Sequence, residues 1–241
     1  MKFKFACWIF LTATAIALPA VADEATVSST TTTNQSGIVS TNGTNGTNAV
    51  VEAKVPGDVF TNSIGMVLIK VGSFWAGKYE VTQKEYQKIV GSNPSTFVGG
   101  TQPVDSVSWN DAVEFCDKLT VRDLETNAVP KGFYYTLPTE DEWQTLVADA
   151  TLADAVTSQN GAVRQSTSPV GSLGPNSLGL YDVRGNVMEF CMTDTDKPYR
   201  VLHGGSWQDS IEENLRTEFR FYCKPDESKN TFGFRCVLKQ K

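Results

Sequence analysis

The segment Gly179–Cys191, with the sequence GLYDVRGNVMEFC, constrains the fold of this chain most strongly. Its Gly185 and Asn186 favour a tight turn, because glycine permits positive φ and a close approach of the backbone. Two carboxylates, Asp182 and Glu189, flank that turn. Carboxylates and exposed carbonyls gathered on a tight loop are the oxygen ligands that a hard cation needs. We therefore expect the rest of the chain to be organised around this loop.

The N-terminal residues have the three-part pattern of a secretory signal peptide. Lys2 and Lys4 precede an apolar run from Phe5 to Leu18, and Ala20-Val21-Ala22 follows. The alternative is a membrane anchor, but the run is shorter than the ~20 residues that a membrane-spanning helix needs. We therefore expect a signal peptide at residues 1–22 and no membrane span after its removal. A secreted, periplasmic or cell-envelope location follows.

Residues 23–54 are rich in Ser, Thr, Asn and Gly and contain few large apolar side chains. Such a segment cannot offset its ordering entropy by burial, so we interpret it as a disordered linker. Residues 55–241 then form the folded part. Their number suits one domain of roughly 150–200 residues.

The chain is acidic, with a formal net charge of −6. The expected signal peptide carries two lysines and no acid, which leaves the mature chain near −8. An acidic chain without a basic cluster argues against nucleic acids and anionic membranes as partners. A protein or glycan ligand remains open.

Three segments predict helices that begin with a capping box, in which a Ser or Thr is followed three residues later by an acid. They begin at Thr82, Ser108 and Thr139. An apolar run and a Gly-Ser turn within Asn62–Thr82 predict a hairpin.

The C-terminal part predicts strands. Mostly apolar residues alternate with mostly charged residues from Leu215 to Tyr222, which is the period of a half-buried strand, and Phe232–Leu238 suits a closing strand. Strands at both ends of the domain with helices between them indicate the α+β class.

Four cysteines follow the signal peptide, at positions 116, 191, 223 and 236. An even number in a secreted protein predicts two disulfides, and the count alone permits three pairings.

Several motifs resemble, in this order, those of the formylglycine-generating, or sulfatase-modifying, enzyme family. They are EVT (80–82), PVDSVSWNDAVEFC (103–116), LPTEDEW (137–143), GPNSLGLYDVRGNVMEF (174–190), RVLHGGSW (200–207) and GFRC (233–236). The resemblance implies an irregular α+β, C-type-lectin-like fold with little regular secondary structure.

The resemblance also implies a calcium site on the central loop. Asp182 and Glu189 would supply side-chain oxygens, and Gly185 and Val187 would supply backbone carbonyls. These hard oxygen donors suit Ca²⁺ better than a softer metal. The alternative is that both carboxylates only accept hydrogen bonds from turn amides.

The resemblance further implies a disulfide between Cys116 and Cys236. Cys191 and Cys223 would then remain for each other, unless both are buried thiols.

The chain departs from the family where the enzymes hold Cu(I) with two cysteines after GGS. The corresponding segment, Gly204–Arg216, contains no cysteine and instead has the acids Asp209, Glu212 and Glu213. Soft thiolates select Cu(I), so we do not expect copper here. A related branch uses iron held by histidines, but His203 is the single histidine of this chain and we expect it to be structural.

These observations predict a non-catalytic, calcium-stabilised binding or scaffold domain. Four aromatic residues suit either a binding face or the core, and we expect most of them in the core: Trp207, Phe219, Tyr222 and Phe232. The alternative function is an oxidoreductase that oxidises a cysteine of a sulfatase or a related substrate.

Overall fold

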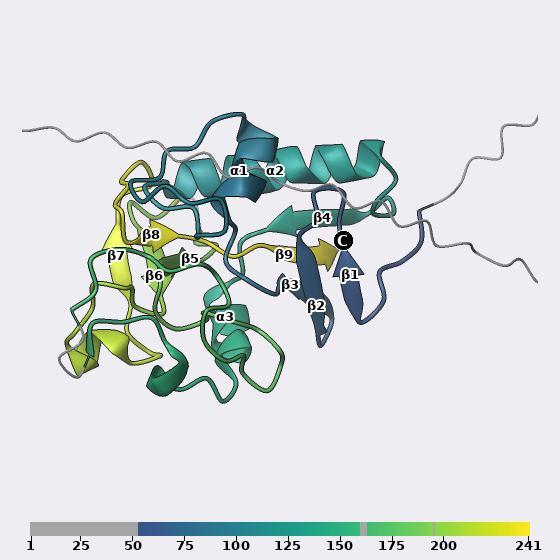
Figure 1. The fold of residues 1–241 in the computed structure, drawn as a ribbon. Helices are drawn as coiled ribbons and strands as arrows, with labels where there is room; N and C mark the ends of the chain where they lie inside the picture. Colours follow the sequence, from purple (N-terminus) through teal and green to yellow (C-terminus); the bar gives the residue numbers. More distant parts are fainter. Residues whose placement is uncertain (1–52, 160–162, 195) are drawn as a thin grey trace, which may run out of the picture. The chain divides into compact units, whose positions relative to one another are not determined.

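Two β-sheets and three α-helices form the framework of the protein (Figure 1). The computed structural model describes residues 53–159, 163–194 and 196–241. The expected signal peptide and nearly all of the expected linker lie outside the described residues. No helix within the described ranges is both long and apolar enough to span a membrane.

The first sheet is antiparallel and has five strands. Their order is β1 (Val59–Thr61), β2 (Val67–Val71), β3 (Phe74–Gly77), β9 (Val237–Gln240) and β4 (Phe133–Thr136). Strands β2 and β3 are the predicted hairpin, with Gly72 at a φ of 59° in the turn. Strand β9, near the C-terminus, lies between β3 and β4, so the sheet joins distant parts of the chain.

The second sheet has four strands. Their order is β7 (Phe221–Cys223), β6 (Arg200–His203), β5 (Met188–Phe190) and β8 (Phe232–Gly233). Only the β5–β8 pair is parallel. The expected closing strand Phe232–Leu238 is wrong as one element: it divides into β8 and β9, which belong to different sheets.

The predicted strand Leu215–Tyr222 is largely wrong. Leu215 ends a short 3₁₀ helix, η3 (Glu212–Leu215), and the Phe219 N–H donates to the Arg216 carbonyl in a turn. These local hydrogen bonds occupy the backbone groups that a ladder would use. Only the end of the alternating pattern enters β7.

The three predicted helices are confirmed as α1 (Gln83–Val90), α2 (Trp109–Glu125) and α3 (Glu140–Val147). Each begins with the complete capping box. The side chain of the N-cap residue accepts a hydrogen bond from the N–H of the third helical residue, whose carboxylate accepts one from the N–H of the N-cap residue. Helix α1 ends at Gly91, which adopts the left-handed conformation. A short 3₁₀ helix, η1 (Leu152–Asp154), follows α3.

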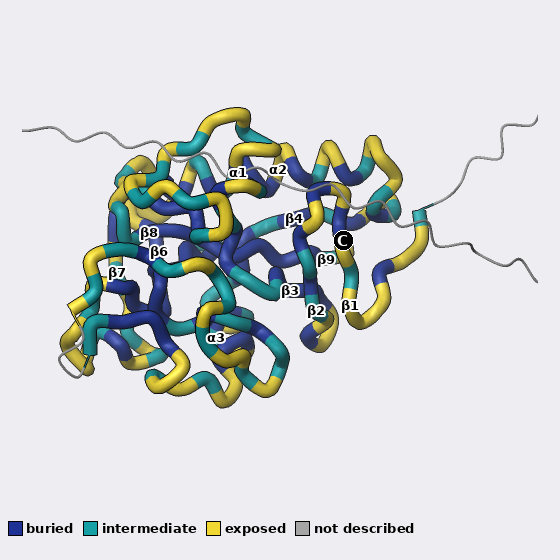
Figure 2. The backbone as a smooth tube through the Cα atoms, in the orientation of Figure 1, coloured by how far each residue is buried: buried dark blue, intermediate teal, exposed yellow. Residues whose placement is uncertain are grey.

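Buried side chains cover both faces of the first sheet. Trp75 and Leu238 are paired and belong to the cluster that also contains residues of α1 and α2. Ala76 and Val237, the next pair, belong to the cluster that includes residues of α3. Accordingly, Figure 1 shows α1 and α2 on one side of β4 and β9 and α3 on the other, and Figure 2 shows the buried strands between them. The expected α+β class is confirmed.

Candidate functional site

The central loop, Gly179–Cys191, is held against two other loops. Gly185 donates to the Gly204 carbonyl at 2.9 Å, and Asn186 donates to the Val156 carbonyl at 2.8 Å. Gly185 has a φ of 81°, and a Cβ there would lie 2.6 Å from the Val156 oxygen. Only glycine therefore fits this position.

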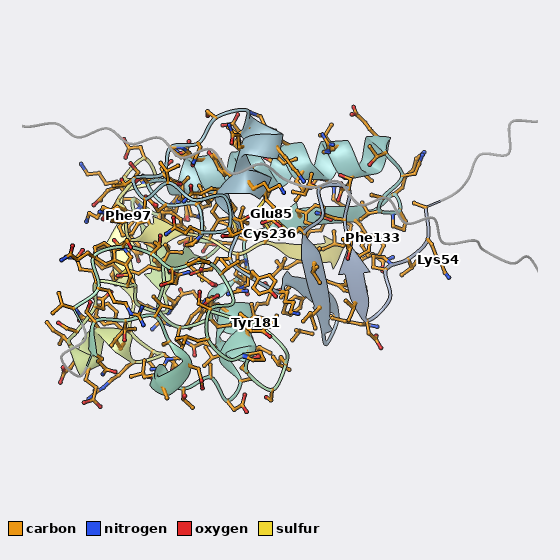
Figure 3. All side chains as sticks on the ribbon, in the orientation of Figure 1. Lys54, Glu85, Phe97, Phe133, Tyr181 and Cys236 are labelled. Carbon is orange, nitrogen blue, oxygen red and sulfur yellow. The ribbon has the colours of Figure 1, made fainter. Side chains whose placement is uncertain are left out.

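Glu189 lies in β5 and forms a buried ion pair with Arg235, on the segment between β8 and β9. Both side chains are fully buried, and Arg235 Nη2 lies 2.7 Å from Glu189 Oε1. The indole of Trp143, from α3, donates to Glu189 Oε2 at 2.9 Å. Arg235 also donates to the carbonyls of Gly77 and Tyr181, the latter labelled in Figure 3. One guanidinium thus connects β3, the central loop and β5.

Two further carboxylates lie close to this pair. Asp182, at a φ of 54°, accepts the Gly171 amide at 2.6 Å. Glu80, which follows β3, accepts the Asn186 side-chain amide at 2.7 Å and the Val187 N–H at 3.0 Å. Sequence reasoning gave Glu80 no role, although it stands in the EVT motif.

Burial raises the pKa of Glu80, Asp182 and Glu189, because the low-dielectric interior disfavours their charged forms. Repulsion by Asp182 and Glu189 raises the pKa of Glu80 further. Three carboxylates share the one guanidinium of Arg235, so full ionisation would leave two negative charges uncompensated. We call these four side chains the buried ionic cluster.

The predicted calcium ligands lie in this part of the fold. Asp182 lines a cavity of about 170 Å³, together with Asp149 and Asp154. The hard oxygens and the excess negative charge of the cluster fit a hard cation. Both oxygens of Glu189, however, already accept hydrogen bonds, and within the described ranges no three His, Cys, Asp or Glu side chains are arranged to hold a metal ion. The calcium site stays a prediction.

The four cysteines of the described residues are all free thiols, and two of them lie close together. The sulfurs of Cys116, in α2, and Cys236 lie 3.5 Å apart in the core, where Figure 3 labels Cys236. Their predicted disulfide is not formed in the structure, yet the two thiols are neighbours.

The structure does not bring Cys191 and Cys223, the other predicted pair, together. Cys191 follows β5 and its N–H donates to Val201 in β6, whereas Cys223 in β7 pairs with Arg200 on the other edge of β6. Strand β6 therefore separates the two cysteines, by about 9.6 Å for two strand spacings. A disulfide needs Cα atoms within about 7 Å. Because Arg200 and Val201 are consecutive in β6, the two cysteines also point to opposite faces of the sheet.

A pocket of about 230 Å³ lies at the segment where the copper enzymes carry their cysteine pair. Of the three acids in Gly204–Arg216, only Asp209 lines it, and its carboxylate accepts the N–H and the hydroxyl of Ser206. Glu212 and Glu213 lie exposed in η3. The remaining lining offers the amides of Gln208 and Asn214, several hydroxyls, the ammonium of Lys229 and the thioether of Met188.

His203 is buried and connects β6 with α3. Its ring stacks on Trp143 at a centroid distance of 4.8 Å, and Nε2 lies 3.0 Å from Glu140 Oε2. Arg220 donates to the same oxygen. Burial opposes the ionisation of Glu140, but the hydrogen bonds from Arg220 and His203 prevail and lower its pKa. These contacts are those of a packed structural residue.

Of the four aromatic residues considered for a binding face, Trp207 and Phe232 are buried and Phe219 is half-buried. Tyr222 alone is exposed, at 53%.

Known proteins resemble this chain in sequence or in fold. A protein named chaperone protein LppX, from Paenibacillus barcinonensis, is 28% identical, with 59% of this chain and 72% of the relative covered. The inactive Cα-formylglycine-generating enzyme 2 of Bos taurus is 30% identical over 56% of this chain, which spans half of that relative's length. The solved structure of Treponema denticola variable protein 1 superposes with a TM-score of 0.59 at 23% identity, covering 78% of this chain and 93% of the other.

The family comparison covers almost the whole chain. The matching description is "Sulfatase-modifying factor enzyme 1-like domain", and the match spans residues 24–240. It agrees with the order of the motifs and with the irregular α+β, C-type-lectin-like fold that the resemblance implied. The chain therefore belongs to the sulfatase-modifying factor enzyme 1-like domain family.

Proposed function

We propose that the protein is an exported, non-catalytic member of its family that acts as a binding or scaffold domain. The observation that carries this proposal is the composition of the pocket at Gly204–Arg216. Its donors are hydroxyls, amides, the ammonium of Lys229, the single thioether of Met188 and one carboxylate that already accepts hydrogen bonds from Ser206. This set lacks the pair of soft thiolates that holds Cu(I), and one thioether does not replace that pair.

The other cysteines do not replace the missing pair. Cys191 and Cys223 lie on different edges of β6 and on opposite faces of the sheet. Burial raises the pKa of Cys191 well above its ordinary value and that of Cys223 to about 11. Both therefore remain protonated near neutral pH, whereas the thiolate is the form that binds a metal.

The names of two relatives support a binding role. One is described as a chaperone protein and another as an inactive formylglycine-generating enzyme. A fold that has lost the reactive groups but keeps its core and loops is suited to recognition.

Calcium is the second part of this proposal. Asp182 and Glu189 would provide carboxylate oxygens, with the carbonyls of Gly185 and Val187 beside them. A divalent cation would offset the excess negative charge of the buried ionic cluster, which otherwise has to take up protons. Its role would be structural, because it would stabilise the loop that joins β3, β5 and the β8–β9 connection.

Copper loading of the full chain, followed by mass spectrometry of a peptide with a sulfatase motif, tests the absence of catalysis. We expect no aldehyde product with or without added Cu(I). Aldehyde formation with multiple turnovers would overturn the proposal in favour of an oxidoreductase. The Cys191→Ser and Cys223→Ser variants, assayed in parallel, would then show whether those thiols are required.

A further inference from the structure

One face of the second sheet is only partly covered by α3. A groove of about 400 Å³ remains between the start of that helix and the strands β6 and β7. Val201 and Tyr222, which are opposite each other in the ladder, line it, and Val201 is buried. This groove is separate from the pocket at Gly204–Arg216, because the two share no lining residue.

Two exposed tyrosines lie in the groove. Tyr199 is 40% exposed and Tyr222 is 53% exposed, and they are the only aromatic residues among the exposed large hydrophobics of the described residues. Their rings are perpendicular, with centroids 5.0 Å apart. Tyrosine and arginine are the residue types enriched at binding hot spots, and Arg220 lines the same groove.

Some charged side chains of the groove already have an ion-pair partner, and others do not. Glu140 is already paired with Arg220 and hydrogen-bonded to His203. Asp141 and Asp194 are exposed and have no ion-pair partner among the described residues. One further cation, Lys197, lines the groove. The available charge is therefore negative, and the net charge of −6 adds a long-range attraction for cations.

We propose that this groove binds a lysine or arginine side chain presented by an extended segment of a polypeptide partner. The cation would contact the tyrosine rings through cation–π attraction and the carboxylates of Asp141 and Asp194 through charge. The apolar stem of the ligand would lie against Met192 and Val201, which also line the groove. This inference rests on the proposed binding function and gives it a partner class.

Fluorescence anisotropy with a labelled tetralysine amide tests this inference, using the full chain at about 20 mM and 150 mM salt. We expect the Kd to rise about 2–5-fold in each of Tyr199→Ala and Tyr222→Ala, as the range for exposed cation–π contacts implies. The Tyr222→Phe variant should bind like the wild type, because the ring face is retained. Acetylating the lysines should abolish binding, since the stem stays and the charge is lost.

Asp194→Asn and Glu125→Gln form a matched pair of variants, because each removes one exposed negative charge and Glu125 lies far along α2 from the groove. We expect Asp194→Asn to weaken binding and Glu125→Gln to leave it unchanged within twofold. Equal effects would show diffuse electrostatic attraction and would overturn the groove assignment.

Absence of tetralysine binding at low salt would overturn it as well, as would binding of a neutral oligosaccharide that Tyr222→Ala abolishes. Thermal melts of every variant confirm that the fold is retained. The aldehyde assay distinguishes the two proposals: no aldehyde with no peptide binding overturns the groove alone, whereas turnover overturns the non-catalytic function.

Discussion

Replacing Arg235 by Met is the most direct test of the buried ionic cluster. Methionine keeps the apolar stem but removes the guanidinium that pairs with Glu189 and whose charge also acts on Glu80 and Asp182. Removing one partner of a buried ion pair costs about 3–5 kcal/mol, because the other charge stays buried and unpaired. The carbonyls of Gly77 and Tyr181 would also lose their donor, so we expect a loss at the upper end of this range.

Urea denaturation of the full chain, followed by fluorescence, measures this loss as a change in the midpoint at constant m-value. Lys118→Met is the matched control, because Lys118 pairs with Glu114 on the exposed face of α2. Such surface pairs contribute about 0.5 kcal/mol or less. In a double-mutant cycle with Glu189→Leu, we expect a coupling energy of about 1–3 kcal/mol. A loss below about 1 kcal/mol for Arg235→Met, or strictly additive effects, would refute the reasoning.

Three other predictions follow from the same region. If calcium binds the central loop, the Tm should rise with calcium concentration and fall in EDTA. The Asp182→Asn variant, which keeps an oxygen that can accept the hydrogen bond from the Gly171 N–H, should remove most of that response. An identical melting curve in EDTA would argue against calcium. Burial raises the pKa of Glu80 in the folded state, so the native state binds more protons at Glu80 than the unfolded state does. The stabilisation from protonated Glu80 is therefore present at acidic pH and is lost as the pH rises above the ordinary carboxyl range. Glu80→Gln should therefore flatten the fall of stability with pH measured in EDTA, and an unchanged slope would contradict the assignment. Non-reducing peptide mapping of the protein isolated under oxidising conditions should find Cys116 linked to Cys236 and the other two thiols free; a Cys191–Cys223 peptide would show that the sheet register is wrong.

Local signals in the sequence predicted local structure well. Each capping box is complete within four residues, so Thr82, Ser108 and Thr139 identify their helices without knowledge of the rest of the fold. The hairpin between β2 and β3 is local for the same reason. The alternation from Leu215 to Tyr222 failed because a period of two does not exclude short turns, and hydrogen bonds at Arg216 and Phe219 made those turns here.

Tertiary relations were harder to predict. The family motifs identified Glu189 but not its partner, because nothing local connects Arg235 or Glu80 with a loop more than forty residues away in either direction. The Cys191–Cys223 pairing followed from elimination, and elimination carries no information about the strand that separates them. Only the β6 register, with Val201 facing one cysteine and Arg200 the other, reveals that separation.

The β8–β9 connection has a consequence for how the chain acquires its structure. Strand β8 completes one sheet and β9 is inserted between β3 and β4 of the other. The β3–β9 ladder, in which Trp75 pairs with Leu238, therefore cannot form before β9 has been synthesised. A chain that leaves the ribosome N-terminus first cannot complete the second sheet until Gly233 has emerged, or the first sheet until Gln240 has emerged. Pairing over such a sequence separation is slow, and until it occurs β3 and β4 expose unpaired edges that can join other chains. Folding is thus delayed until translation has passed the GFRC motif. Correct folding requires that the nascent chain stays unfolded and does not aggregate before that point.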